Sequence, residues 1–461
     1  MLSIVKITTL GVIASISLSA IAFAQSGPTQ NPPKELTAFL NVSLIDGTGA
    51  ALQKGMGVLI QEGRIKTIAL SDDLKANLPQ GIKTIDGSGQ YLLPGLIDSH
   101  VHMATVPNAK QAKAYLRRYL YSGITSVRDM AGDTRALSDL ARNSRLKNIP
   151  SPDLYFSALM AGPTFFKDPR PASSAQGEKP GYVPWMQAIT PDTDMKTAVA
   201  LSRGTWATGV KIYANLAPND VKRIADEARH QGIKTWAHSM VFPTFPSEVI
   251  EAGVDVISHV CRLAFEISKE KPTEYHHKII PNYDALNPRD DRIKALYKTM
   301  VDKNMILDAT IRVYTEAERR REAEPKDKQK PVACPSSFAA RLTKFAFENG
   351  VEIATGTDGQ MPFQAAYPEL HEELEHLTKK VGMPPLSVIR SATLVGAMAL
   401  GLDDEKGSIE VGKKADLVLI SKNPLKDISN LRSVVLTMKS GTIYNRNAYN
   451  KIEKDEVQND K

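Results

Sequence analysis

The sequence contains only two cysteines among its 461 residues, and it has no long block of like charges. Two cysteines permit one disulfide and exclude a small scaffold held together by many bridges. The 58 Lys and Arg residues and 51 Asp and Glu residues give a net charge of +7, which is too small and too scattered to predict a nucleic-acid partner. With 42% hydrophobic and 24% charged residues, the composition is that of a globular protein with a large core.

Long hydrophobic runs are also missing beyond the first residues, so no later segment is predicted to cross a membrane. At the start, a single Lys in Met1–Lys6 precedes the apolar run Ile7–Ile21, and Ala22-Phe23-Ala24 has the small-x-small pattern of a cleavage site. We therefore expect a signal peptide cleaved after Ala24 and a periplasmic or secreted protein. Cleavage would leave 461 − 24 = 437 residues and lower the charge to +6, because Lys6 is lost. An uncleaved anchor is disfavoured because the run is shorter than the roughly 20 residues that span a bilayer.

Strand-rich segments with turns occur near both ends of the chain. One covers residues 36–93, and two others cover residues 415–421 and 434–444. Neither end is long enough to form a stable sheet domain by itself. We therefore predict one small β-sandwich domain built from residues 25–94 and 403–461, with residues 95–402 inserted as a continuous second domain.

The inserted region alternates strand and helix signals, which is typical of parallel strands joined by crossover helices. The expected strands are Gly95–His100, Ile124–Arg128, Leu154–Leu159, Val210–Tyr213, Thr235–His238, Val256–His259, Ile306–Thr310 and Glu352–Thr357. Eight strands is the number in a (β/α)8 TIM barrel, and the 358 − 100 = 258 positions from His100 to Asp358 match its usual size. The predicted fold class is α/β, a TIM barrel with a small outer β domain.

Two long stretches, residues 160–191 and 262–335, are expected to lie over the mouth of this barrel, where substrates bind. Within the second stretch, residues 318–330 contain six basic and four acidic side chains and predict a solvated flap. Among the crossover helices, Asn219 is expected to cap one that ends at Gly232.

Residues able to bind metal occur at or near the carboxyl ends of the predicted strands, which form the catalytic face of such a barrel. They are His100, His102, Lys211, His238, His259 and Asp358. His100 and His102 lie two residues apart on an extended segment, so both rings share a face and can reach one ion. One H-x-H pair arises easily by chance. Four of the nine histidines at corresponding strand ends, with an Asp and a Lys, predict a metal site.

Several segments around these residues resemble the amidohydrolase superfamily of metal-dependent barrel hydrolases. They are Pro94–His102, Gly123–Asp129, Lys211, His238, His259, Thr357-Asp358 and Gly412–Val418. The resemblance covers residues 36–444. The presence of Lys211 is similar to the binuclear branch that includes prolidase-like dipeptidases and ochratoxin-type amidases, whereas the related imidazolonepropionases use one metal and lack that lysine.

This resemblance implies two divalent ions, typically Zn²⁺, and a Lys211 that is carboxylated by carbon dioxide and bridges them. Of the remaining ligands, it implies that three bind the first ion and two the second. They are His100, His102 and Asp358 for the first, and His238 and His259 for the second.

Elementary chemistry agrees with this ligand set. An unmodified ammonium facing two divalent cations would be repelled, so Lys211 must be modified or turn away. Nitrogen and oxygen ligands suit Zn²⁺, and also Mn²⁺, Co²⁺ or Fe²⁺. Cys261 is a conceivable soft ligand, but the set is complete without it. A water between two ions ionises near neutral pH and attacks a carbonyl, while Asp358 can pass its proton to the departing amine.

Four further residues are candidates for roles beside the metals. Asp98 shares a strand face with His100, so it either orients an imidazole or has a structural role in the turn. Tyr213, two residues beyond Lys211, either donates to the developing oxyanion, as a corresponding tyrosine does in similar dipeptidases, or packs in the core. Arg128 and Arg312 could bind a substrate carboxylate. The favoured alternatives are a salt bridge with a neighbour for Arg128 and solvent exposure for Arg312.

The predicted function is a binuclear metal-dependent hydrolase of an amide bond, in a dipeptide, Xaa-Pro-like or ochratoxin-like amide, or N-acyl amino acid with a free carboxylate. Hydrolysis of a cyclic amide, lactone or phosphotriester by the same site is the rival, and a non-catalytic scaffold is disfavoured by the complete ligand set. The expected partner is a small molecule, and homo-oligomerisation stays open. Cys261 and Cys334 fall on the same face in neighbouring units, so a disulfide between them is expected.

Overall fold

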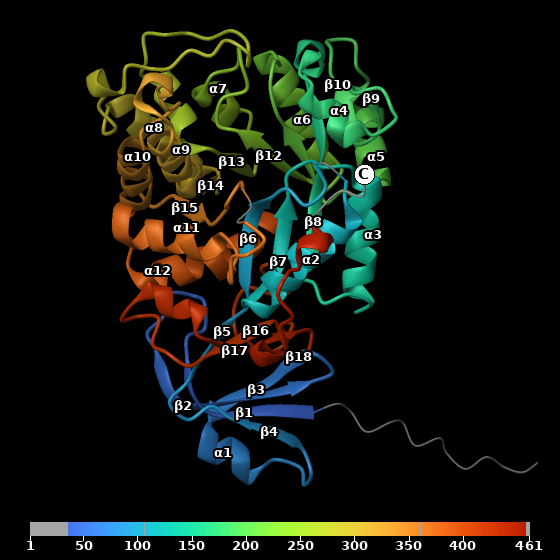
Figure 1. Ribbon diagram of the computed structural model, residues 1–461, viewed down its shortest axis with the longest axis vertical. Helices are drawn as coiled ribbons and strands as arrows, with labels where there is room; N and C mark the ends of the chain where they lie inside the picture. The colour runs from blue at the N-terminus through green and yellow to red at the C-terminus, as the bar shows by residue number, and fades with distance from the viewer. Residues whose placement is uncertain (1–35, 106, 360–361, 458–461) are drawn as a thin grey trace, which may run out of the picture. The chain divides into compact units, whose positions relative to one another are not determined.

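The computed structural model describes residues 36–105, 107–359 and 362–457, which form two sheets with helices (Figure 1). The expected signal peptide and its cleavage site after Ala24 lie outside the described residues. No helix in the described ranges is both long enough and apolar enough to cross a membrane.

The larger sheet is the predicted barrel, and all eight expected strands are present. They are β6 (Leu96–Val101), β7 (Ile124–Asp129), β8 (Asp153–Ala161), β11 (Gly209–Ile212), β12 (Lys234–His238), β13 (Val256–Ser258), β14 (Ile306–Asp308) and β15 (Glu352–Ala354). Each pairs in parallel with the next along the chain. Most of their residues are buried on both faces, as expected when helices cover a parallel sheet. The predicted α/β barrel is therefore confirmed.

Backbone hydrogen bonds between the first and last strands nearly close this barrel. The Ser99 amide donates to the Thr355 carbonyl at 2.7 Å, and the Asp358 amide donates to the His100 carbonyl at 2.9 Å. The closing bonds therefore lie beside two of the predicted ligands, and they fix His100 and Asp358 relative to each other.

Helices follow most of the barrel strands and cover their outer side (Figure 1). They are α2 (Ala109–Tyr121), α3 (Thr134–Arg145), α5 (Met195–Gly204), α6 (Pro218–His230), α7 (Pro246–Glu251), α8 (Asp291–Asp302), α9 (Ile311–Ala323), α10 (Ser336–Glu348), α11 (Leu370–His376), α12 (Pro385–Arg390) and α13 (Gly396–Leu400). The predicted cap at Asn219 is wrong, because Pro218 occupies the first helical turn of α6 and Ala217 is the N-cap.

The two long stretches over the barrel mouth contain structure of their own. The first holds α4 (Arg170–Ala175), β9 (Tyr182–Val183) and β10 (Met186–Ala188), and β10 extends the sheet beside β8. The second, expected as one connection over residues 262–335, is interrupted by α8 and β14, so its two parts lie before α8 and after β14. The predicted flap at residues 318–330 is mostly exposed.

The smaller sheet combines strands from both ends of the chain, as predicted, and its blue and red strands lie together in Figure 1. Its members are β1 (Leu36–Leu44), β2 (Gln53–Gln61), β3 (Arg64–Leu70), β4 (Lys83–Asp86), β5 (Tyr91–Pro94), β16 (Leu417–Ile420), β17 (Val434–Lys439) and β18 (Thr442–Asn445), with α1 (Ser71–Ala76) after β3. The two ends are joined where β5 pairs antiparallel with β16. Apolar side chains from both ends, including Phe39, Leu92 and Leu417, form one core. The predicted domain boundaries at residues 94 and 402 stay predictions.

Candidate metal centre

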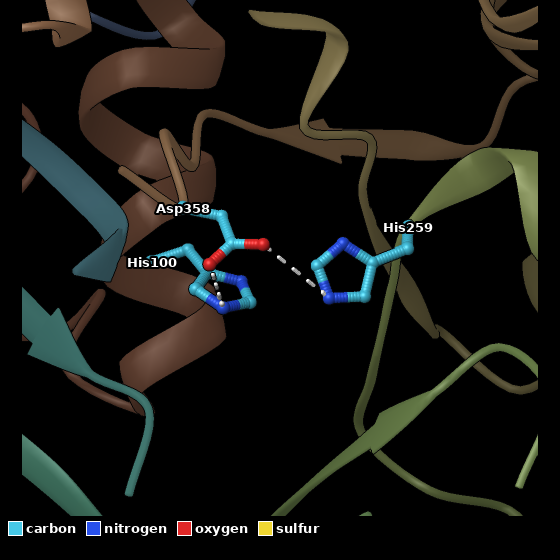
Figure 2. A group of neighbouring side chains, drawn as sticks. All are labelled: His100, His259 and Asp358. Carbon is cyan, nitrogen blue, oxygen red and sulfur yellow. Dashed lines mark ion pairs between the residues drawn. The ribbon is translucent and has the colours of Figure 1, made fainter. Parts of the chain in front are cut away.

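Three predicted ligands form a compact group at the carboxyl ends of the barrel strands. His100 lies in β6, His259 directly follows β13, and Asp358 follows β15, and one ligand atom from each lies within 4.8 Å of the others. Asp358 lies between the rings, with Oδ1 3.5 Å from His100 Nε2 and Oδ2 3.8 Å from His259 Nε2 (Figure 2). Two imidazole nitrogens and a carboxylate facing a common point are ligands that suit a divalent metal ion.

His102 extends this group on the side of Asp358. Its Nε2 lies 3.0 Å from Asp358 Oδ1, and its Nδ1 lies 3.2 Å from the Thr105 hydroxyl. Both imidazoles of the H-x-H pair therefore approach the same carboxylate oxygen, as their shared strand face predicts.

The backbone turns sharply at two of these ligands. His259 has a φ of 73° and Asp358 a φ of 43°, both in the left-handed region that non-glycine residues rarely adopt. Such a conformation costs of the order of 1 kcal/mol or more and is kept where the surrounding structure enforces it. Here the His259 amide donates to the Asp308 carbonyl at 3.0 Å, which fixes the turn that aims the ring into the site.

Lys211 and His238 complete the predicted set from β11 and β12. Lys211 is 1% exposed, and neither its Nζ nor His238 Nδ1 has a hydrogen-bond partner among the described residues. Burial lowers the pKa of Lys211 to about 7, although Asp308 and Asp358 oppose this shift. A buried amine without an acceptor is costly. A further group bound in the site would therefore give Lys211 and His238 the partners that they lack among the described residues.

The electrostatics of the site favour neutral rings at His100, His238 and His259 beside an ionised carboxylate, whereas Asp358 raises the pKa of His102 against the effect of burial. Burial lowers the pKa of His100, and it lowers those of His238 and His259 well below their usual range. For Asp358, burial acts in the opposite direction, but His100 and His102 outweigh it and hold its pKa low. Neutral rings retain the lone pair that a metal ligand needs.

Asp308, at the end of β14, is a site residue that the sequence reasoning missed. It is fully buried, and its Oδ2 lies 2.7 Å from His100 Nδ1 and accepts from the Ser258 hydroxyl at 2.8 Å. A carboxylate bound to one ring nitrogen sets the tautomer and leaves the other nitrogen as the ligand. The detectable signal was an acidic residue at the end of the apolar strand Ile306-Leu307-Asp308.

Asp98 has the structural role that was one of its two predicted alternatives. Its carboxylate accepts from the backbone amides of His100 at 3.1 Å and Thr357 at 3.2 Å, and from the Thr357 hydroxyl at 2.9 Å. It thus joins the first and last barrel strands. The orientation of an imidazole, predicted for Asp98, is performed by Asp308.

Tyr213 lies beside the predicted ligands. Its ring centroid is 4.2 Å from that of His238, and its hydroxyl is 3.4 Å from the hydroxyl of Tyr275. Burial and the neighbouring Tyr275 raise the pKa of Tyr213, so it remains a proton donor at neutral pH. Tyr275 was not predicted, and it comes from the second long stretch.

Arg128 and Arg312 are both buried and bonded to other residues. Arg128 donates from Nε to the Ser99 carbonyl at 2.6 Å and lies 3.7 Å from Asp308, which matches the neighbouring salt bridge expected for it. The solvent exposure expected for Arg312 is wrong: its side chain is 4% exposed and pairs with Glu372 at 2.9 Å. The reason is that α9 packs against α11, which supplies Glu372.

A disulfide joins Cys261 and Cys334, whose Cα atoms lie 6.3 Å apart. It connects the segment after β13 with the residue before the N-cap of α10. The sulfur of Cys261 is therefore bonded to Cys334 and is not a thiolate ligand for a metal ion.

Curated relatives match different shares of the chain. A 5-methylthioadenosine/S-adenosylhomocysteine deaminase of Thermoanaerobacter pseudethanolicus is 37% identical over 106 residues, which are 20% of this chain and 24% of that protein. In that match the chain spans only about a quarter of the relative's length. Imidazolonepropionase of Thermoplasma acidophilum is 21% identical over 417 residues, covering 84% of this chain and 88% of that protein.

Solved structures share the fold over most of the chain. A Xaa-Pro dipeptidase with bound methionine has a TM-score of 0.68 and 22% identity, covering 89% of this chain and 100% of that one. The A. niger ochratoxinase has a TM-score of 0.69 and 20% identity, covering 89% and 96%. The sequence profile of the Amidohydrolase family matches residues 91–444, which include the barrel and every candidate ligand. The chain therefore belongs to the amidohydrolase family.

Proposed function

We propose that this hydrolase holds two divalent metal ions and cleaves the amide bond of a dipeptide or an N-acyl amino acid. The observation that supports it best is Lys211, a buried amine without a hydrogen-bond partner that lies among neutral histidines and Asp358. A lone ammonium would repel metal ions there. The carboxylated form would instead add an anion and complete a site for two ions.

Carboxylation needs only carbon dioxide. The neutral Lys211 amine forms a nitrogen–carbon bond to carbon dioxide and loses one proton, which leaves a carbamate with a single negative charge. The proposed ligands are then divided as the resemblance implies: His100, His102 and Asp358 for one ion, His238 and His259 for the other, with Lys211 shared. Because the protein donors are nitrogen and oxygen atoms, Zn²⁺ is the favoured ion.

Two divalent ions held by these residues would supply an ionised water at neutral pH and would polarise the substrate carbonyl. The side chain of Asp358 is 23% exposed, so its carboxylate is open to accept the proton of the attacking water and return it to the departing amine nitrogen. Tyr213 is a phenol with a raised pKa beside His238, and its hydroxyl donates to the carbonyl oxygen as negative charge develops there.

The choice of an amide rests on the chemistry of a binuclear site and on the fold shared with a dipeptidase and an ochratoxinase. Cyclic amides, lactones and phosphotriesters could use the same groups and remain the rival substrates. A panel of dipeptides, N-acyl amino acids, lactones and triesters separates these classes directly.

The decisive experiment compares wild type with Lys211→Ala by elemental analysis and by turnover of that panel. We expect about two metal ions per chain and amide turnover in wild type, and a loss of at least one ion and of about a thousandfold or more in kcat/KM in the variant. Lys222→Ala is the control, because that side chain is 61% exposed and pairs with the surface residue Asp226. Two bound ions and retained turnover in Lys211→Ala would contradict the carbamate.

A further inference from the structure

Arg262 lies in the turn that follows β13, three residues after the candidate ligand His259. Its backbone amide donates to the His259 carbonyl at 3.0 Å, and its neighbour Cys261 is fixed by the disulfide to Cys334. The residue therefore leaves the barrel at the same end as the candidate ligands, on a short 3-10 turn (Val260–Glu266) that is held on both sides.

The guanidinium of Arg262 lies against an aromatic wall next to the site. Its Cζ is 5.3 Å from the ring centroid of Phe242 and 5.3 Å from that of Tyr275. The Tyr275 ring is in turn stacked on His238, with 6.2 Å between centroids and 18° between the planes. Tyr275 therefore neighbours both this cation and a candidate metal ligand.

No carboxylate neutralises Arg262 within the ranges that the structure describes, since it has neither an ion pair nor a side-chain hydrogen bond there. The side chain is nevertheless partly buried. A guanidinium that faces two aromatic rings and has no carboxylate partner keeps its hydrogen-bond donors available to an anionic ligand.

The other arginines near the site differ in this respect. Arg170 lies 5.3 Å from the same Tyr275 ring, but it binds Asp168 through two nitrogens, at 3.0 and 2.8 Å. Arg128 and Arg312 are buried and have the acidic partners described above. Arg262 is thus the arginine beside the aromatic wall whose charge is not already balanced.

We propose that Arg262 binds the free carboxylate of the amino acid on the leaving side of the scissile amide, while Phe242 and Tyr275 contact its apolar side chain. This inference rests on the proposed amide hydrolysis and specifies its substrates: acids with an apolar or aromatic side chain, rather than the corresponding amides or esters. The planar guanidinium suits a carboxylate because it donates two parallel hydrogen bonds.

The test measures binding rather than turnover. Metal-loaded wild type, Arg262→Met and Arg170→Met are titrated with 3-phenylpropanoate and with its neutral counterpart 3-phenylpropanamide by calorimetry. We expect wild type to bind the acid at least thirtyfold more tightly than the amide, and Arg262→Met to lose about thirty- to a hundredfold in affinity for the acid but less than threefold for the amide. Arg170→Met, whose charge is already paired, should keep most of the preference.

Equal affinity of wild type for the two ligands would overturn the assignment, and so would an Arg262→Met variant that keeps the full preference for the acid. The latter result would mean that the metal ions alone bind the carboxylate. If the acid preference depends on Arg262 but no amide in the panel is cleaved, the proposed function fails and the anion site stands. If amides are cleaved without any such preference, the proposed function stands and Arg262 has no part in recognition.

Discussion

Asp308 acts on the candidate centre through His100, because its carboxylate binds the ring nitrogen that faces away from Asp358. Replacing such a partner typically weakens metal binding by about 10- to 100-fold, since the ring loses its fixed tautomer and orientation. We therefore expect Asp308→Asn to bind Zn²⁺ about 10- to 100-fold more weakly in competition with a chelator. Ser258→Ala, which removes only one hydroxyl donor to the same carboxylate, should lose less than tenfold. Affinity within threefold of wild type in Asp308→Asn would contradict the role given to Asp308.

The grouping of His100, His259 and Asp358 could be predicted from the sequence because strand ends of a parallel barrel must meet. The residues around them were not, because their contacts depend on segments distant in the chain. Asp308 looks in sequence like an ordinary strand-end acid, and Tyr275 lies in a loop without periodicity. Arg312 looks exposed beside a charged segment, but its position depends on Glu372, 60 residues later. The orientation of a side chain toward a distant helix or strand leaves no signal in the residues next to it in sequence.

The helix α9 begins without a side-chain cap from its own N-cap residue, Thr310. Glu373 of α11 serves instead: its two carboxylate oxygens accept from the backbone amides of Ile311 at 3.0 Å and Arg312 at 2.6 Å. Burial raises the pKa of Glu373 to about 8, although these two bonds favour the ionised form. At neutral pH the folded protein therefore keeps this side chain mostly protonated.

This raised pKa makes α9 a source of pH-dependent stability. Between about pH 4.5 and 8 the folded state binds a proton at Glu373 that the unfolded state has lost, so the free energy of unfolding falls as pH rises, by up to about 1.4 kcal/mol per pH unit. Glu373→Gln, which stays neutral, should lack this slope. We expect thermal unfolding midpoints of wild type to fall relative to Glu373→Gln from pH 5 to 8. Parallel midpoints across that range would contradict the raised pKa of Glu373.

The positions of the barrel strands were predicted better than the exact start of α6 and the pairing between distant strands. The eight barrel strands could be located because each is a short apolar run between turn signals, and their burial on both faces leaves little alternative. The N-cap of α6 was predicted at Asn219 because of its side chain. The helix begins earlier, because Pro218 fixes the geometry of the first turn and Ala217 is the N-cap. The pairing of β5 with β16 is a contact across most of the chain, and no local pattern specifies its register.

At the scale of the whole molecule, a buried charge cluster joins the barrel to the smaller sheet. Asp153 begins β8 at the barrel end opposite the candidate ligands, and it lies 2.9 Å from the amines of both Lys406 and Lys439. Lys406 also contacts Asp416 at 2.9 Å. Both lysine side chains are at most 4% exposed, so their charges depend on these carboxylates for compensation.

Removing one carboxylate from this cluster should destabilise the folded protein. We expect Asp153→Ala to lower the free energy of unfolding by about 3 kcal/mol or more, because two buried ammonium groups lose their shared partner. Asp139→Ala, which affects only an exposed pair with Arg142 at 3.6 Å, should change it by less than about 0.5 kcal/mol. Thermal unfolding measures both, and kcat at 25 °C should stay unchanged in the folded protein. A shift in Asp153→Ala no larger than in the control would show that the cluster contributes nothing to stability.

The antiparallel pairing of β5 with β16 has a consequence for the order in which the protein can be made. Pro94 and its partner Leu417 are 417 − 94 = 323 positions apart, and the whole barrel is encoded between them. During synthesis, therefore, the barrel can finish folding while one edge of β5 still has no neighbour. An open strand edge is a template for pairing with another chain. Nascent or truncated chains that end before residue 417 should accordingly be the aggregation-prone species of this protein, because β16, β17 and β18 complete the smaller sheet.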